Sequence, residues 1–321
     1  MIKIIRPEQG KSLNFSMFVK GISMKIRIMK NIFTLLLIVA VTSINAQEIT
    51  YKVLAAKGKN AIEKAVKPGN YTPLYTGMKL NANDKILLGD GGYLGLAGSN
   101  GKTVELKDKG MYNVSELSSN SAADNSSLAM RYVEHIFSDL QADAAATSNM
   151  SITGSVERST SSAAVDVMCP NNTKILLQQT QISWDSKENI EEYHIAVSNF
   201  FDEEIFGMDT KDKNAVIDFS VMNLNLQEAY KLTVVKKGAS LESGEQIVLK
   251  FPNEEEAKAA QSVNADEASA IQNLVSASYM ENNGFYLNST RMYQKASVLE
   301  PSVEDFKKEY EEYLKRIGSG K

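Results

Sequence analysis

Few residues of this chain have the type and spacing that chemistry requires. Its two histidines, His135 and His194, fall in separate stretches, so a metal centre or a histidine-based triad would need partners from elsewhere in the chain. The single cysteine, Cys169, has no second cysteine with which to form an intrachain disulfide. We interpret both histidines as solvated or half-buried side chains and Cys169 as a small buried residue.

The acidic residues between positions 202 and 214 come nearest to a cation site. The oxygen-bearing side chains there are Asp202, Glu203, Glu204, Asp209, Asp212 and Asn214. A calcium loop alternates its oxygen ligands around a central glycine and ends in a distal glutamate, and the spacing here does not follow that pattern. We interpret these residues as solvated loop charges. Carboxylate pairs that hydrolyse glycosides are defined by their distance in space, so a hydrolase with a dispersed site stays open.

A glycine-rich stretch from Gly89 to Gly95 has the composition of a phosphate-binding loop. Such a loop ends in Lys-Ser or Lys-Thr and leads into a helix, and this stretch has neither feature. We interpret its glycines as turn residues. The sequence therefore predicts no catalytic residue, no cofactor-binding residue and no metal ligand.

The distribution of charge argues against nucleic acid as a partner. Of the 35 basic and 39 acidic residues, seven basic and one acidic lie in residues 1–46, which leaves 28 and 38 in the remainder. That remainder has a net charge of −10 and no basic stripe that could neutralise phosphates. The length of 321 residues allows two or three domains of about 100–150 residues each.

Residues 24–46 have the three parts of a secretory signal peptide. Basic residues precede the apolar run Ile32–Val41, and small residues follow it. We predict cleavage between Ala46 and Gln47, with export to the periplasm or the extracellular space. A ten-residue apolar run is shorter than the ~20 residues that span a bilayer, so we expect no stable membrane span after cleavage, although retention as an anchor stays open.

Two further expectations concern this leader. Residues 1–23 carry no pattern of their own and Met24 stands where a signal peptide would start, so we interpret 1–23 as a non-native extension. The ending Ile44-Asn45-Ala46-Gln47 resembles export signals of Bacteroidetes. No cysteine lies near residue 46, so the sequence lacks the lipid-attachment pattern of bacterial lipoproteins.

Residues 47–117 alternate short apolar runs with glycine, asparagine and aspartate, which predicts a small all-β domain. Its clearest hairpin joins Tyr93–Leu96 to Thr103–Leu106 through Asn100-Gly101, a pair that favours a type I′ turn. The region resembles the FecR-like domain of envelope proteins at Gly77–Leu80, Asp84–Ile86, Gly89, Gly92–Leu96, Asn100-Gly101, Val104–Leu106 and Met111–Val114. This resemblance implies a scaffold rather than an activity.

Residues 118–171 are rich in serine, alanine and asparagine, which predicts a linker. Within it, Leu128, Tyr132, Ile136 and Leu140 recur at every fourth position. This spacing predicts one amphipathic helix near 127–142 that packs on a neighbouring domain.

Residues 172–252 form a second alternating region, with predicted strands at 181–184, 193–197 and 230–235. The order of Trp184, Leu224 and Tyr230 resembles a fibronectin type III or immunoglobulin-like sandwich. That resemblance implies a buried Trp184 and a hydrogen bond from Tyr230 to a nearby backbone group.

Residues 253–321 are predicted to form a helical tail. Asn253 can cap a helix that starts at Glu254, Asn264 with Glu267 a second helix to about residue 281, and Ser302 with Asp305 a third. In the third, an apolar face is predicted from Phe306, Tyr310, Tyr313, Leu314 and Ile317.

Part of this tail resembles one tetratricopeptide repeat. The matching residues over about 270–303 are Ala277, Gly284, Tyr286, Tyr293, Ala296, Leu299 and Pro301. Ser276 and Ser289 depart from the pattern, and a lone repeat needs neighbouring elements for stability. Tyr286, Tyr293, Phe306 and Tyr310 are candidates for a partner-binding groove, but core packing is the favoured interpretation of these four residues.

The sequence thus predicts a multi-domain, mainly β protein: a small all-β domain and a β-sandwich, followed by an α-helical hairpin tail. Its predicted function is that of an exported, non-catalytic envelope adaptor that binds a protein or glycan. Two alternatives are a periplasmic component of a FecR-like signalling system and an envelope hydrolase.

Overall fold

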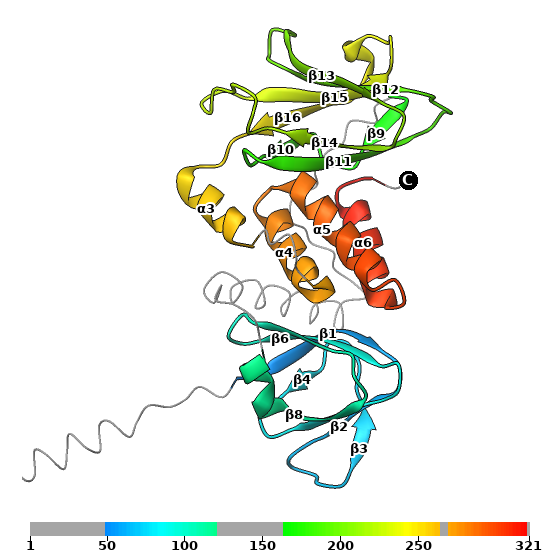
Figure 1. Cartoon of the computed structure of the whole chain (residues 1–321), viewed down its shortest axis with the longest axis vertical. Coiled ribbons are helices and arrows are strands. Elements are labelled where there is room, and N and C mark those ends of the chain that lie inside the picture. The colour runs from blue at the N-terminus through cyan, green and yellow to red at the C-terminus, as the bar shows by residue number, and fades with distance from the viewer. Residues whose placement is uncertain (1–48, 121–162, 264–268, 320–321) are drawn as a thin grey trace, which may run out of the picture. The chain divides into compact units, whose positions relative to one another are not determined.

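The computed structural model describes residues 49–120, 163–263 and 269–319 (Figure 1). Contacts group Ile49–Lys321 into one unit. Several predicted features lie outside the described residues, namely the leader 1–46 with the Ala46–Gln47 cleavage point, the helix near 127–142, His135, and the cap formed by Asn264 and Glu267.

The first β region, residues 49–120, contains two four-stranded antiparallel sheets. One has the order β4 (Lys79–Leu80), β1 (Tyr51–Lys57), β6 (Tyr93–Gly98), β7 (Thr103–Leu106). The other has the order β3 (Tyr71–Pro73), β2 (Asn60–Glu63), β5 (Lys85–Leu88), β8 (Gly110–Asn113), and a 3₁₀ helix, η1 (Val114–Asn120), follows it. Apolar side chains from both sheets, including Val53, Ile62, Leu88 and Leu96, form the core of this region.

The predicted hairpin between β6 and β7 is confirmed, but its predicted turn type is wrong. Ala97 pairs with Thr103, and the amide of Gly101 donates to the carbonyl of Gly98 over 2.8 Å. Gly101 has a φ of 78°, whereas Asn100 is not among the described residues with positive φ. A type I′ turn needs positive φ at both central residues, so the chain instead makes a three-residue loop that ends in a left-handed glycine.

The second β region, residues 163–251, also has two sheets. The five-stranded sheet has the order β10 (Asn172–Lys174), β16 (Gln246–Lys250), β15 (Tyr230–Lys236), β12 (Tyr193–Ser198), β13 (Glu204–Thr210). The three-stranded sheet has the order β14 (Asn214–Asp218), β11 (Gln179–Ser186), β9 (Val165–Val167), and η2 (Leu241–Ser243) precedes β16. The three strands predicted here from alternation lie within β11, β12 and β15.

This region begins earlier in the chain than the predicted boundary at residue 172. In β9, Val165 and Val167 are buried and pair with Ser186 and Trp184 of β11. Cys169 is buried in the same core, as expected. The prediction of a linker at residues 163–171 is therefore wrong. The alternating residues Val165, Val167 and Cys169 are buried, and they decide the local structure despite the surrounding serine and alanine.

Two aromatic residues stabilise the second β region as the sequence predicts. Trp184 is fully buried and makes an edge contact with Tyr193, with ring centroids 5.4 Å apart. The hydroxyl of Tyr230 accepts a hydrogen bond from the amide of Asn225 over 2.8 Å. This bond fixes the loop that leads into β15.

Replacing Tyr230 by phenylalanine is expected to lower the free energy of unfolding by about 0.5–1.5 kcal/mol, because the amide of Asn225 loses its acceptor. Urea denaturation of both proteins measures the change. Tyr75→Phe is the matched control, since the side chain of Tyr75 is exposed. Equal losses in the two variants would contradict the role assigned to the Tyr230 hydroxyl.

The described residues of the C-terminal segment form four helices, α3 (Glu254–Val263), α4 (Ala270–Asn282), α5 (Tyr286–Leu299) and α6 (Glu304–Arg316). The Asn253 cap is confirmed, because its side chain accepts from the amide of Glu256 while the Glu256 carboxylate accepts from the amide of Asn253. Helix α4 is capped by Ser269, whose side chain and amide bond reciprocally with Gln272. The predicted cap of α6 by Ser302 and Asp305 is wrong, since Val303 is the N-cap residue and makes no side-chain bond.

The described part of the chain is therefore mainly β, in four sheets, with a helical segment at its C-terminal end. None of the helices within the described ranges has the length and apolarity that a membrane crossing requires.

Candidate functional site

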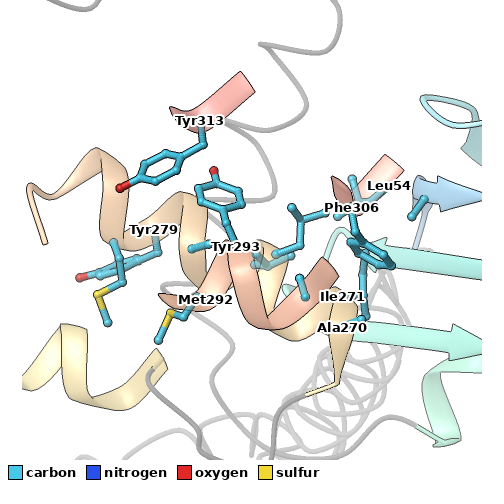
Figure 2. Packing of buried hydrophobic residues seen from close by; sticks show 14 of the residues in the cluster. Leu54, Ala270, Ile271, Tyr279, Met292, Tyr293, Phe306 and Tyr313 are labelled. Carbon is cyan, nitrogen blue, oxygen red and sulfur yellow. The ribbon is translucent and has the colours of Figure 1, made fainter. Parts of the chain in front are cut away.

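The helical segment shares a hydrophobic core with the first β region. Leu54 of β1 and Tyr93 of β6 belong to the same buried cluster as Ile271 of α4 and Phe306 of α6, as Figure 2 shows in part. The rings of Tyr93 and Phe306 meet edge to face, with centroids 5.8 Å apart. Gly95 allows this close packing, because a Cβ there would lie 2.8 Å from Cδ1 of Ile271.

Asp305 connects the start of α6 to the first β region. Its Oδ2 accepts hydrogen bonds from the amide of Ala56, over 2.9 Å, and from the hydroxyl of Thr76, over 2.8 Å. Nearby, the ammonium of Lys57 donates to the hydroxyl of Ser302 over 2.9 Å. The two residues predicted to cap α6 thus bind strand β1 and its surroundings instead.

Glu105 of β7 makes a second polar connection to the helices. Its carboxylate accepts hydrogen bonds from the Tyr93 hydroxyl and from the amide of Ile271, each over 2.9 Å. Lys107 lies 3.0 Å from Glu105 and 2.5 Å from Glu300. Burial alone would raise the pKa of Glu105, but the Ile271 amide and Lys107 outweigh it, so this pKa lies below its ordinary value. The anion therefore faces the first turn of α4, where the helix dipole stabilises negative charge.

The helical segment also makes hydrogen bonds to the second β region. Thr173 of β10 accepts from the amide of Tyr286 over 3.0 Å, and the amide of Lys174 donates to the carbonyl of Gly284 over 2.7 Å. The hydroxyl of Thr290 donates to the carbonyl of Met168 over 2.9 Å. These bonds fix the connection between α4 and α5 against the chain around β10.

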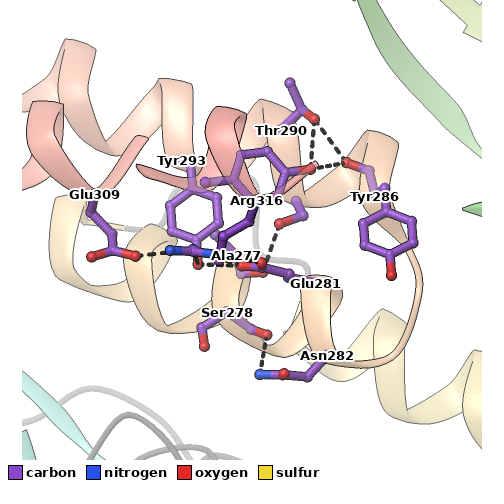
Figure 3. A network of polar contacts seen from close by, with 11 residues as sticks. Ala277, Ser278, Glu281, Asn282, Tyr286, Thr290, Tyr293, Glu309 and Arg316 are labelled. Atoms are coloured by element: carbon purple, nitrogen blue, oxygen red, sulfur yellow. Dashed lines mark hydrogen bonds and ion pairs between the residues drawn. The ribbon is translucent and has the colours of Figure 1, made fainter. Parts of the chain in front are cut away.

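A polar network joins the C-terminal ends of α4 and α6 (Figure 3). Arg316 contacts Glu281 through two nitrogens, at 2.8 and 3.0 Å, and Glu309 at 3.1 Å. The hydroxyl of Tyr293 donates to Glu281 over 2.9 Å. Burial raises the pKa of Glu309 above its ordinary value despite the nearby arginine. The network connects the C-terminal ends of α4 and α6 through Arg316.

His194 has the most nearly catalytic surroundings in the described part of the chain. Its Nδ1 lies 2.7 Å from Asp209 and its Nε2 lies 3.2 Å from Glu204. Gly207 leaves room for this contact, because a Cβ there would lie 2.1 Å from Oε1 of Glu204. Both ring nitrogens are engaged by carboxylates, so neither is directed at a hydroxyl or thiol that it could activate. The arrangement is an ion-pair cluster on the surface of β12 and β13.

The pKa of His194 is expected to lie above its ordinary value. Burial alone would lower it, but hydrogen bonds to Asp209 and Glu204 and their negative charges outweigh burial. The protonated histidine therefore stabilises the fold fully below about pH 6.5, and this contribution, below ~1 kcal/mol, is lost as the pH rises through the raised pKa. Titration of the His194 ring proton by NMR measures the midpoint.

The NMR test has two internal controls. His194→Gln identifies the signal, because the sequence contains only one other histidine. Asp209→Asn is expected to lower the midpoint, since it removes the carboxylate at Nδ1. A midpoint at or below the ordinary histidine value in the unaltered protein would contradict the assigned ion pairs.

The four residues predicted for a groove are divided between core and surface. Tyr293 and Phe306 are buried in the core of the helical segment, whereas Tyr286 and Tyr310 are half-buried at its edge. Tyr310 lines a pocket of about 350 Å³ together with Ser297, Pro301, Lys307, Glu311 and Leu314. The predicted apolar face of α6 is confirmed, because Phe306, Tyr313 and Ile317 are buried.

Close packing and a positive φ explain two of the glycines in the glycine-rich stretch, and ion pairs engage two residues of the acidic stretch. A Cβ on Gly89 would lie 2.3 Å from the carbonyl oxygen of Lys59, and Gly91 has a φ of 61°. Asp209 pairs with His194 and with Lys237, and Asp202 pairs with Lys231. Within the described ranges no group of three or more potential ligands could hold a metal ion.

Sequence reasoning missed the residues that connect the regions, above all Asp305, Glu105 and Arg316. Asp305 was interpreted as a helix cap because it stands three residues after a serine. Its actual partner Ala56 lies 249 positions away, a separation that local spacing does not reveal.

No protein-family model matches this chain, and no curated protein matches it either.

Proposed function

We propose that this protein is an exported, non-catalytic binding protein of the cell envelope that acts as an adaptor for a protein or glycan. In this proposal the helical segment is a scaffold, and the two β regions are the modules that it holds. The observation that carries the proposal is that the helices share a core with the first β region and, with the second, both hydrogen bonds and a core that contains Leu287 of α5. Such connections suit a protein whose role is to present surfaces in a fixed arrangement.

We further propose that the first β region is a FecR-like domain. Its antiparallel strands and its turns at Gly77, Gly91 and Gly101, all with positive φ, support this. A domain of this kind supplies a scaffold, and its relatives act in the envelope as parts of signalling systems.

The second β region is proposed to be a fibronectin type III or immunoglobulin-like sandwich. Of its seven strands other than β10, the first, second and fifth, which are β9, β11 and β14, share one sheet, while β12, β13, β15 and β16 lie in the other. The short β10 pairs in parallel with β16. This alternation between sheets, the buried Trp184 and the hydrogen bond of Tyr230 all support the assignment.

Helices α4 and α5 are proposed to form one tetratricopeptide-like unit. Ala277 is fully buried, and the hydroxyl of Ser289 donates to its carbonyl over 2.9 Å, so the two helices approach closely at small residues. Helix α6 covers this pair with Phe306 and Tyr313 while its outer face carries charged residues. A polar outer helix is what an isolated repeat needs in order to remain soluble.

Affinity capture from native envelope fractions, followed by quantitative mass spectrometry, tests the proposal. One protein or glycan enriched reproducibly over a tag-only control supports the adaptor. Enrichment of an inner-membrane regulator would instead favour a FecR-like signalling component. Turnover of cell-wall or polysaccharide substrates that a single carboxylate substitution abolishes would overturn the non-catalytic assignment.

A further inference from the structure

The connection between β12 and β13 exposes two adjacent aromatic side chains. Phe201 is 86% exposed and Phe200 is 56% exposed, and the exposed Ile205 follows at the start of β13. Single exposed apolar residues are normal on protein surfaces. Three within six positions, at the tip of one hairpin, form a patch that calls for a physical reason.

The backbone that carries these rings is held in one conformation by Asn199. Its side-chain oxygen accepts from the amides of Phe201, over 2.9 Å, and Glu203, over 3.0 Å. Its side-chain nitrogen donates to the carboxylate of Glu203 over 2.7 Å, and its amide donates to the carbonyl of Glu203 over 3.0 Å. The rings are therefore presented by an ordered turn, which lowers the entropy lost when they become buried in a complex.

Asp202 adds to this order. It has a φ of 64°, and among the described residues it alone combines positive φ with a side chain. Its carboxylate forms an ion pair with the ammonium of Lys231, a residue only 7% exposed, and that ammonium lies 5.9 Å from the centre of the Phe200 ring. A buried lysine thus fixes both the strained residue and one of the aromatic rings.

The loop that enters β15 carries further exposed apolar residues at the same end of the sheet. Ser198, the last residue of β12, pairs with Lys231 at the start of β15, so the loops leaving β12 and entering β15 emerge at the same end of the sheet. The second loop carries the exposed residues Val221 and Leu226. We call the five apolar residues at this end the tip surface: Phe200, Phe201, Ile205, Val221 and Leu226.

The charges around the tip surface select its partner. Asp202, Glu203 and Glu204 follow the two phenylalanines directly, and the side chain of Asp202 is 68% exposed. Lys231, which is buried, pairs with Asp202, and His194 lies 3.2 Å from Glu204, so the three carboxylates outnumber the two basic groups that contact them. Acidic groups beside the patch repel anionic lipid headgroups and attract lysine and arginine side chains.

We propose that the tip surface binds a partner protein through an apolar pocket bordered by lysine or arginine side chains. This inference rests on the proposed binding function and adds to it the surface and the chemistry of the partner. The phenylalanines are the anchors, because large aromatic side chains that become fully buried contribute most to the energy of protein interfaces. The acidic residues orient the complex and accelerate association.

A random-peptide phage library selected on the full chain, with counter-selection on Phe200→Ser/Phe201→Ser, tests the proposal. Enriched peptides are expected to combine apolar residues with lysine or arginine. The best one, made synthetically, should bind the double variant roughly 10–100-fold more weakly than the unaltered chain. Val66→Ser, a change at an exposed apolar residue of the first β region, is the matched control and should leave the affinity unchanged.

Several outcomes would overturn the inference. The inference is wrong if the selection enriches no peptide or enriches acid-rich peptides. It is also wrong if the enriched peptides bind the unaltered chain and the double variant equally. Binding to phosphatidylglycerol vesicles that the double variant loses would assign the tip surface to membranes, and a dimer that the double variant loses would assign it to a second copy of the chain. The peptide measurement is repeated with Val221→Ser/Leu226→Ser, which leaves the Asn199 turn unaltered and should also weaken binding.

Capture from envelope fractions separates this inference from the proposed function. If a partner is captured equally well by the unaltered chain and by Phe200→Ser/Phe201→Ser, the adaptor function stands and the tip surface is not its site. If neither protein captures a partner, the adaptor function itself fails.

Discussion

Replacing Phe306 by alanine is expected to lower the free energy of unfolding by about 3–5 kcal/mol. The ring is 1% exposed and belongs to the core that the helical segment shares with the first β region. Its removal forfeits the edge contact with Tyr93 and leaves a cavity beside Leu54 and Ile271, which the strands and helices cannot fill without moving. Chemical denaturation followed by circular dichroism measures the loss.

Phe201→Ala is the matched control for this substitution. It removes the same ring from a position that is 86% exposed, so the free energy of unfolding should change by less than about 0.5 kcal/mol. Similar losses in the two variants would show that Phe306 does not connect the helices to the first β region. A broadened or two-step transition in Phe306→Ala alone would show that the regions have begun to unfold separately.

Replacing Asp305 by alanine is expected to lower the free energy of unfolding by about 2 kcal/mol, because hydrogen bonds to a charged acceptor contribute about 1.5–3 kcal/mol to stability. One oxygen of Asp305 accepts from both the Ala56 amide and the Thr76 hydroxyl, and both donors lose their acceptor together. Hydrogen exchange at the Ala56 amide should accelerate in the variant, and denaturation gives the free energy.

Two comparisons distinguish the contact of Asp305 with Ala56 and Thr76 from a role as helix cap. Ser302→Ala removes the other residue predicted to cap α6, yet it loses only an exposed bond to Lys57 and should change stability little. Thr76→Val combined with Asp305→Ala should cost less than the sum of the single changes, because the two residues share one bond. Strict additivity, or an Ala56 amide that exchanges as before, would contradict the assigned contact.

The sequence predicted best where structure depends on near neighbours. Alternation located β11, β12 and β15, and Asn253 with Glu256 formed the predicted cap, since partners three residues apart meet whenever a helix starts there. The hairpin at Asn100-Gly101 was also found, although a one-residue difference in loop length changed its turn type.

It predicted less well where partners come from distant parts of the chain. Asp305 looks like a capping residue from its neighbours, and only the fold brings it to Ala56. Core packing, the favoured interpretation of Tyr293 and Phe306, is confirmed, but a helix pattern does not show which element covers the face that they lie on. Likewise His194 gained its carboxylate partners from β13, where register rather than spacing decides which residues meet.

The bond between Ala56 and Asp305 also bears on the timing of folding. Strand β1 is made early in synthesis, whereas the carboxylate that binds it, and the ring that covers Tyr93, come 249 and 213 positions later. Contacts of such long separation form late, because the whole intervening chain must first be brought together. An incomplete chain that stops before α6 would leave Leu54 and Tyr93 without the cover of Phe306. The last helix therefore completes the packing around Leu54 and Tyr93 only after the rest of the chain has been made.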